Sequence, residues 1–134
     1  MAILTVKLLK VTNLSDGDTL GKSDPFVKFN LEQDNVVFDK NFGDKKSTKK
    51  GGQLNPVYDE TFSWEIPSSM GLNNLVLRCK VMDDDPIFDD KLGFCKIKLE
   101  DLSLTSTPIG IDRVIDNNIF TADGRIYLEL SYDP

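Results

Sequence analysis

Short runs of alternating residues, separated by turn-forming residues, constrain the fold of this chain most strongly. Two runs show the pattern clearly, with core-forming side chains at every second position: Leu75, Leu77, Cys79 and Val81 in one, and Phe62, Trp64 and Ile66 in the other. A period of two residues places these side chains on one face of an extended strand, whereas a helix needs a period near 3.6. The sequence contains no convincing long helical segment.

Eight segments of this kind are expected to form strands. They cover residues 3–11, 25–31, a segment that begins at 36–38, and residues 61–66, 75–82, 94–99, 109–115 and 125–132. Short strands at regular spacing, with turn signals between them, predict one all-β domain over residues 1–134, an eight-stranded antiparallel β-sandwich. Cys79 and Cys95 fall within two of the strands and are expected to be buried free thiols.

The stretch Met82–Gly93, between two expected strands, contains five aspartates among twelve residues. Mutual repulsion among so many carboxylates costs folding free energy, so a compensating cation is expected. Oxygen ligands without a nearby histidine favour a hard divalent ion, Ca2+ before Mg2+. The alternative is an ordinary solvated loop, because Asp and Pro favour turns for backbone reasons.

Composition argues against several other functions. The chain has no histidine, which removes the commonest general base and transition-metal ligand, and it has no nucleophile elbow or phosphate-gripping glycine-rich motif. An enzyme is therefore not expected. An EF-hand loop that starts at Asp83 would place Phe88 where glycine is needed and Phe94 where glutamate is needed. A net charge of −6 disfavours nucleic acid as a partner.

The sequence also predicts where the protein works. No apolar run approaches the roughly 20 residues that span a bilayer. The N-terminal residues lack the layout of a signal peptide and do not match a myristoylation motif. A cytosolic protein is therefore expected.

Three stretches together resemble the C2 domain family, in order and spacing, across almost the whole chain. Leu14–Val27 resembles the family's first calcium-binding loop and the strand after it, Leu54–Glu60 resembles its Leu-Asn-Pro turn, and Val81–Asp85 with Asp90–Gly93 resembles its third loop. The resemblance implies a Greek-key sandwich that binds Ca2+ between loops at one end and then docks on phospholipid. A segment like Gly124–Leu130 comes first in the family's first topology, so the second, circularly permuted topology (type II) is expected here.

The resemblance also implies the metal ligands. Asp18, Asp24, Asp83, Asp85 and Asp90 match the family's ligand positions, with Asp16 and Asp89 as additional candidates. The interval from Asp83 to Asp90 is one residue shorter than usual, so Asp89 is an alternative to Asp90 as the last ligand. Asp84 is expected to face away from the site. Two or three Ca2+ ions would change the net charge from −6 to −2 or 0, which makes the surface neutral or attractive to anionic headgroups.

Two further lipid contacts are expected. The apolar residues Leu20, Ile87 and Phe88 near the loop tips are expected to enter the membrane, the alternative being that they fold back onto the loops. The run Lys45–Lys50 resembles the lysine-rich strand of C2 domains that bind phosphoinositides, with Lys46 and Lys50 on one strand face. Lysines that protect an edge strand explain the run equally well.

The function expected from these observations is calcium-dependent binding of anionic phospholipid, such as phosphatidylserine. The protein is expected to be a cytoplasmic monomer that Ca2+ recruits to membranes, as a peripheral module in signalling and membrane trafficking. The alternative is a C2-fold module that binds an unknown protein partner, with or without calcium.

Overall fold

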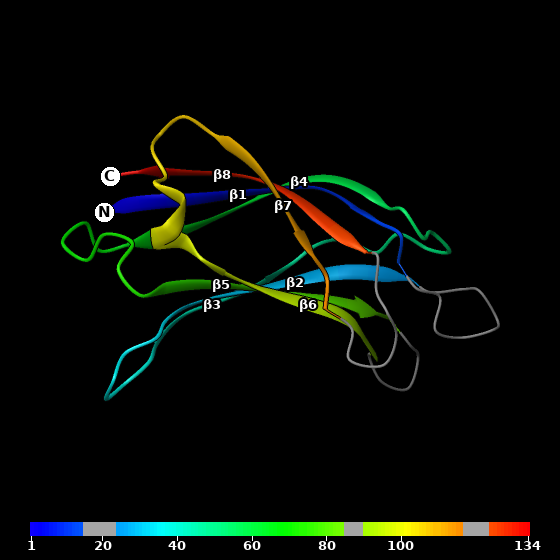
Figure 1. Cartoon of the computed structure of the whole chain (residues 1–134), viewed down its shortest axis with the longest axis horizontal. Coiled ribbons are helices and arrows are strands. Elements are labelled where there is room, and N and C mark those ends of the chain that lie inside the picture. Colours follow the sequence, from blue (N-terminus) through cyan, green and yellow to red (C-terminus); the bar gives the residue numbers. More distant parts are fainter. Residues whose placement is uncertain (15–23, 85–89, 117–123) are drawn as a thin grey trace.

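The computed structural model describes residues 1–14, 24–84, 90–116 and 124–134. Of Asp90 and Lys91 it describes the backbone alone. Two four-stranded sheets face each other (Figure 1). The elements are β1 (Ala2–Thr12), β2 (Pro25–Gln33), β3 (Lys40–Lys46), β4 (Val57–Ile66), β5 (Leu75–Asp83), β6 (Asp90–Lys98), the 3-10 helix η1 (Leu99–Leu102), β7 (Ile109–Val114) and β8 (Arg125–Asp133). In the part of the chain that is described, no helix is long and apolar enough to cross a membrane.

The sheet orders are β4-β1-β8-β7 and β3-β2-β5-β6, and all the paired strands are antiparallel. The predicted eight-stranded antiparallel sandwich is therefore confirmed. The last strand, β8, lies between β1 and β7, with Leu130 opposite both Val6 of β1 and Ile109 of β7. This position of the final strand is the one expected for the second topology, and it brings the two ends of the chain close together in Figure 1.

The alternating sequence pattern produces the core between the sheets. In β8 the side chains of Ile126, Leu128 and Leu130 are fully buried, whereas the residues between them are half-buried. Phe29 of β2 and Phe62 of β4 bring the two sheets together, with ring centroids 5.3 Å apart. Full burial of such a side chain stabilises the fold by roughly 1.5–3 kcal/mol. Cys79 and Cys95 are buried free thiols, as predicted.

One expected strand start is wrong. Residues 36–38 were expected to begin the third strand, but β3 begins at Lys40, and residues 34–39 form the connection from β2 to β3. The backbone N–H of Asn35 donates to Oδ1 of Asp39, 2.9 Å away, so the chain turns where the apolar run suggested that it would extend. The apolar residues of the turn have no facing sheet to cover them, and they are exposed.

Tyr58 anchors the start of β2. Its buried hydroxyl donates to the carbonyl of Pro25, 2.7 Å away, and burial raises the pKa of Tyr58 well above its ordinary value. Tyr58→Phe is expected to lower the free energy of unfolding by about 1 kcal/mol at neutral pH, because the carbonyl of Pro25 loses the hydroxyl as a donor and keeps only the backbone N–H of Lys50. Urea unfolding of both proteins would measure this difference, with Tyr127→Phe in β8 of the same sheet as the control.

The raised pKa of Tyr58 also sets the pH dependence of this difference. The stability that the neutral hydroxyl contributes is fully present below pH 10.0, the ordinary pKa, and is lost as the pH rises above it. Wild type is therefore expected to lose stability above that pH more steeply than Tyr58→Phe. Parallel pH profiles for the two proteins would contradict this role of Tyr58.

Candidate metal centre at the aspartate end

Three neighbouring strands bring predicted ligands together at one end of a sheet, where the strands begin or finish. Pro25 at the start of β2 is opposite Asp83 at the end of β5, and Asp83 is also opposite Asp90 at the start of β6. Neighbouring strands lie about 4.8 Å apart. The backbones of Asp24, Asp83 and Asp90 are therefore grouped at one end of the sheet β3-β2-β5-β6, on the right in Figure 1.

Asp24 and Asp83 are held together directly, although they are 59 positions apart in the sequence. The backbone N–H of Asp24 donates to Oδ1 of Asp83, 2.8 Å away, and the N–H of Asp84 donates to the carbonyl of Asp24, 3.1 Å away. Both aspartates are half-buried. The carboxylate of Asp83 is thus oriented against the start of β2, with one of its oxygens held by a backbone donor.

A glycine leaves room for the carboxylate of Asp24. A Cβ atom on Gly51 would lie 3.2 Å from Oδ1 of Asp24, which is a tight contact. The preceding residue, Lys50, is fixed beside β2, because its N–H donates to the carbonyl of Pro25 at 3.0 Å. The carboxylate oxygens of Asp24 and Asp83 are therefore partly buried, and Gly51 leaves space beside the first of them. Such hard donors suit Ca2+.

Asp84 makes a different contact from its neighbour. Its Oδ2 lies 2.8 Å from Nζ of Lys49, so Asp84 is paired with a cation of the lysine run. Since the side chains of Lys49 and Asp84 are 59% and 33% exposed, solvent screens the ion pair and it contributes little to stability. It does bring positive charge close to the aspartate end, where it reduces the repulsion among the carboxylates.

The remaining predicted ligands and membrane contacts are not part of the described chain. They are Asp16, Asp18, Asp85, Asp89, Leu20, Ile87 and Phe88, and the side chain of Asp90 is likewise outside the description. Their roles stay predictions.

The lysine run does not form one strand. Lys46 and Lys50 were expected to share a strand face, but β3 ends at Lys46. The chain leaves the strand because Ser47 turns inward, where its N–H donates to the carbonyl of Val27 and its Oγ accepts the N–H of Val27. Lys50 lies beyond this point, with its Nζ 5.9 Å from the centre of the Tyr58 ring.

Lys46 instead belongs to a row of three lysines across the outer face of the sheet. Lys28 of β2 is directly opposite both Lys46 of β3 and Lys80 of β5. Like charges in directly opposite positions destabilise a sheet, so this row concentrates positive charge at a cost. Lys28 and Lys80 lie far from the lysine run in the sequence, and only the strand register brings the three lysines together.

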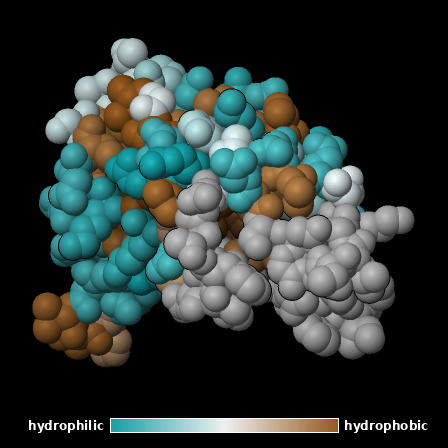
Figure 2. Space-filling view, turned by 45° about the vertical axis from the view of Figure 1, so that its right-hand side comes forward, coloured by the Kyte–Doolittle hydropathy of each residue, from teal (hydrophilic) through white to brown (hydrophobic). Residues whose placement is uncertain are grey.

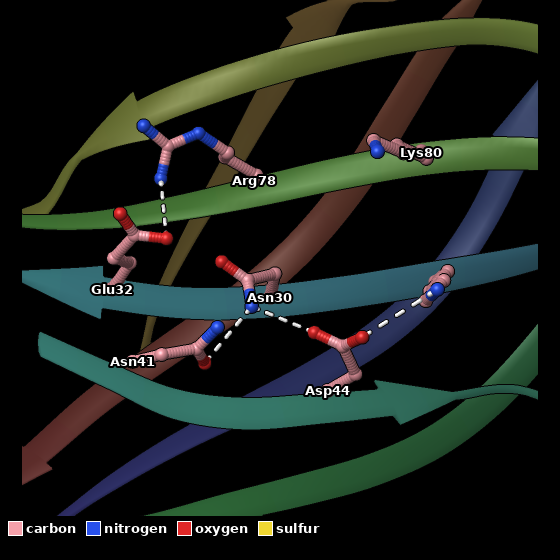
Figure 3. Close-up of a pocket in the computed structure, with 7 residues that line it drawn as sticks. Asn30, Glu32, Asn41, Asp44, Arg78 and Lys80 are labelled. Carbon is pink, nitrogen blue, oxygen red and sulfur yellow. Dashed lines mark hydrogen bonds and ion pairs between the residues drawn. The ribbon is translucent and has the colours of Figure 1, made fainter. Parts of the chain in front are cut away.

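Asp44 and Asn30 lie beside this row, in a polar hollow (Figure 3). Nδ2 of Asn30 donates to Oδ1 of Asp44 at 2.6 Å, and Nζ of Lys28 lies 3.5 Å from Oδ2 of Asp44. The hydrogen bond from Asn30, and then the charge of Lys28, hold the pKa of Asp44 below its ordinary value. Asp44 therefore offsets only part of the charge of the lysine row at neutral pH.

A second group of carboxylates lies at the opposite end of the same sheet. Oxygens of Glu32, Asp34 and Asp39 lie within 4.8 Å of one another. Asp34 already contacts two cations, Arg78 at 3.1 Å and Lys96 at 3.7 Å. Protein cations thus offset this group, which is separate from the predicted ligands.

Comparison with known proteins identifies similar sequences. A family model described as "C2 domain" matches residues 2–112. Synaptotagmin-C of Diplobatis ommata is 34% identical over 95 residues, which cover 70% of this chain and 17% of that protein. Synaptotagmin-1 of Homo sapiens is 39% identical over 84 residues, which cover 63% of this chain and 19% of that protein. The matched regions are thus less than a fifth of these relatives.

Solved structures show the same architecture. The C2A domain of plant Extended Synaptotagmin 1 has a TM-score of 0.82 at 25% identity, covering 99% of this chain and 95% of that chain. Human GIVD cytosolic phospholipase A2 has a TM-score of 0.77 at 20% identity, covering 98% of this chain and 17% of that chain. The second likeness is one of fold alone.

Proposed function

The chain belongs to the C2 domain family, and on that premise we propose that it is a calcium-dependent module for binding anionic phospholipid membranes. One observation carries the proposal: Asp83 at the end of β5 is hydrogen-bonded to the backbone of Asp24 at the start of β2. Two half-buried aspartates are thereby held together at one end of the sheet, where a cation would relieve the repulsion between their carboxylates.

The residues proposed to hold Ca2+ are Asp24 and Asp83, together with Asp18, Asp85 and Asp90. Bound Ca2+ would supply positive charge and open coordination positions for phosphate or carboxylate oxygens of lipid. Of these, Asp24 and Asp83 lie at strand ends, which orient ligands more rigidly than free loops do. Lys49, paired with Asp84, adds positive charge beside them.

Co-sedimentation with phosphatidylserine-containing vesicles tests this function. Sedimentation that requires Ca2+ and disappears with a chelator is the expected result. If the protein binds Ca2+ in solution but does not sediment with the vesicles, this result would favour binding of a protein partner in the presence of calcium. That is the alternative function considered from the sequence. If it does not bind Ca2+ at all, the proposed mechanism is wrong.

The lysine row supports a second lipid contact, with the multiply charged headgroup of a phosphoinositide. Lys28, Lys46 and Lys80 present three ammonium groups on one sheet face, and Lys28 is paired with Asp44, the one ion pair of this row within the described part of the chain. A headgroup with several phosphates would relieve the repulsion within the row. Lys50, which the sequence also indicated, lies outside this row and is not needed for the contact.

Lys28→Ala/Lys80→Ala is expected to weaken binding to vesicles containing phosphatidylinositol bisphosphate by about tenfold or more, since each lysine near a membrane contributes about 1 kcal/mol. Lys7→Ala/Lys10→Ala removes the same charge from β1 on the other sheet and serves as the matched control. Titration with vesicles at fixed salt would measure both. Equal weakening by the two double variants would show that only net charge matters, and would contradict a site on the row.

A further inference from the structure

The connection between β2 and β3 carries three consecutive exposed apolar side chains, which we call the hairpin tip. The exposed fractions of Val36, Val37 and Phe38 are 103%, 77% and 80%. In Figure 1 the hairpin extends away from the body of the sandwich, at the end opposite the aspartates. Figure 2 shows a hydrophobic projection at its lower left, on the side where this hairpin ends. The core does not use these side chains.

Polar contacts hold the base of the hairpin in place. The N–H of Asn35 donates to Asp39 within the turn, at 2.9 Å, and the N–H of Asp34 donates to the carbonyl of Asn74, at 2.9 Å. Nε2 of Gln33 also donates to the carbonyl of Asn73, at 3.1 Å. The base is therefore tied to the connection between β4 and β5. The tip is presented in a preformed shape, so little conformational entropy would be lost when it binds.

The charges around the base offset one another. Asp34 contacts both Arg78 and Lys96, and Glu32 lies 3.7 Å from Arg78. Asp39, the third carboxylate of the group, precedes Lys40 in the sequence. With three acidic and three basic residues in this region, the tip has no strong preference for an anionic or a cationic surface.

The size and shape of the tip favour a lipid bilayer as its partner. Three side chains on a projecting turn are far fewer than the roughly 20–30 residues that each side of a stable protein interface contributes. A bilayer requires no matching pocket, because acyl chains adapt to an inserted apolar group. We propose that Val36, Val37 and Phe38 insert into the interface of a zwitterionic bilayer, without Ca2+, at the end of the sandwich opposite the aspartates.

Phe38→Trp provides a direct reporter of insertion. In a chelating buffer, phosphatidylcholine vesicles are expected to shift its emission to shorter wavelength, and bromine atoms on the acyl chains are expected to quench it. Trp64, the natural tryptophan of the chain, is 3% exposed and contributes a constant fluorescence background from the core. Because Ca2+ is absent, the result is independent of the function proposed for the aspartates.

Val36→Ser/Val37→Ser/Phe38→Ser should lower the partition coefficient for the same vesicles by about tenfold or more, because the apolar area available for burial is lost. Val57→Ser/Val114→Ser changes two half-exposed valines elsewhere (53% and 49% exposed) and should leave partitioning unchanged.

Three results would overturn the proposal. The first is an unshifted Phe38→Trp spectrum at millimolar lipid. The second is a shift that requires phosphatidylserine and Ca2+, which would assign the contact to the aspartate end. The third is a shift without lipid, accompanied by self-association in sedimentation velocity, which would assign the tip to a protein contact.

Discussion

Asp83→Asn is expected to weaken Ca2+-dependent sedimentation with phosphatidylserine vesicles, raising the Ca2+ concentration for half-maximal binding on the order of 100-fold or more. Asparagine keeps an oxygen that can accept the N–H of Asp24, now 2.8 Å from Oδ1 of Asp83, so the strand ends should remain in place. It removes the negative charge, and a unit charge pair at 4 Å near a protein surface is worth about 4 kcal/mol.

Asp84→Asn is the matched control, because it makes the same chemical change one residue along the chain. Asp84 is paired with Lys49, and its backbone N–H, which binds the carbonyl of Asp24, is retained in the variant. Its Ca2+ response should stay within about threefold of wild type, because an ion pair that solvent screens contributes little. An equal loss in both variants would indicate a general charge effect, and an unaffected Asp83→Asn would refute the proposed metal centre.

Gly93→Ala should destabilise the fold by about 1–3 kcal/mol, as overpacking of a core does. Gly93 is buried in β6, and an added Cβ would overlap Cγ2 of Ile115, which is 2% exposed. Ile115 cannot move away easily, because Asp116 beside it exchanges two backbone hydrogen bonds with Phe94, at 3.0 and 2.8 Å. Thermal or urea unfolding of the variant would measure the loss.

Gly110→Ala is the control for this second experiment. Gly110 also lies in a strand, β7, but an added Cβ there would meet no atom within 4 Å. Removing a strand glycine at an open position should leave stability unchanged or raise it by roughly 0.5–1 kcal/mol, because the unfolded chain loses freedom. Equal destabilisation at the two glycines would mean that contact with Ile115 is not the cause.

The sequence predicted the strands well where alternation coincided with a covered face. In β8, the apolar positions Ile126, Leu128 and Leu130 all face the core. The same reasoning misjudged Val36–Phe38, because β-forming side chains extend a strand only if a second sheet buries them, and here a turn hydrogen bond decided the path. Burial by another part of the chain is not visible in a local sequence pattern.

The candidate site was predictable only in part, and for a different reason. Asp24 and Asp83 were indicated by the resemblance to a family, since their contact across 59 positions has no local signature. The row of Lys28, Lys46 and Lys80 was missed because it depends on the register of three strands. A clustered lysine run drew attention to Lys50, which lies outside the strand.

The pairing of β1 with β8 determines when the sheet can form during synthesis. Ile3 is opposite Asp133 and Thr12 is opposite Arg125, so β1, which can pair with β4 earlier, lacks its second neighbour until residues 125–133 have left the ribosome. Contacts between residues so distant in sequence give a high contact order, which slows folding. Until then the nascent chain exposes one hydrogen-bonding edge of β1, and shielding of that edge would protect the chain from aggregation while it is being made.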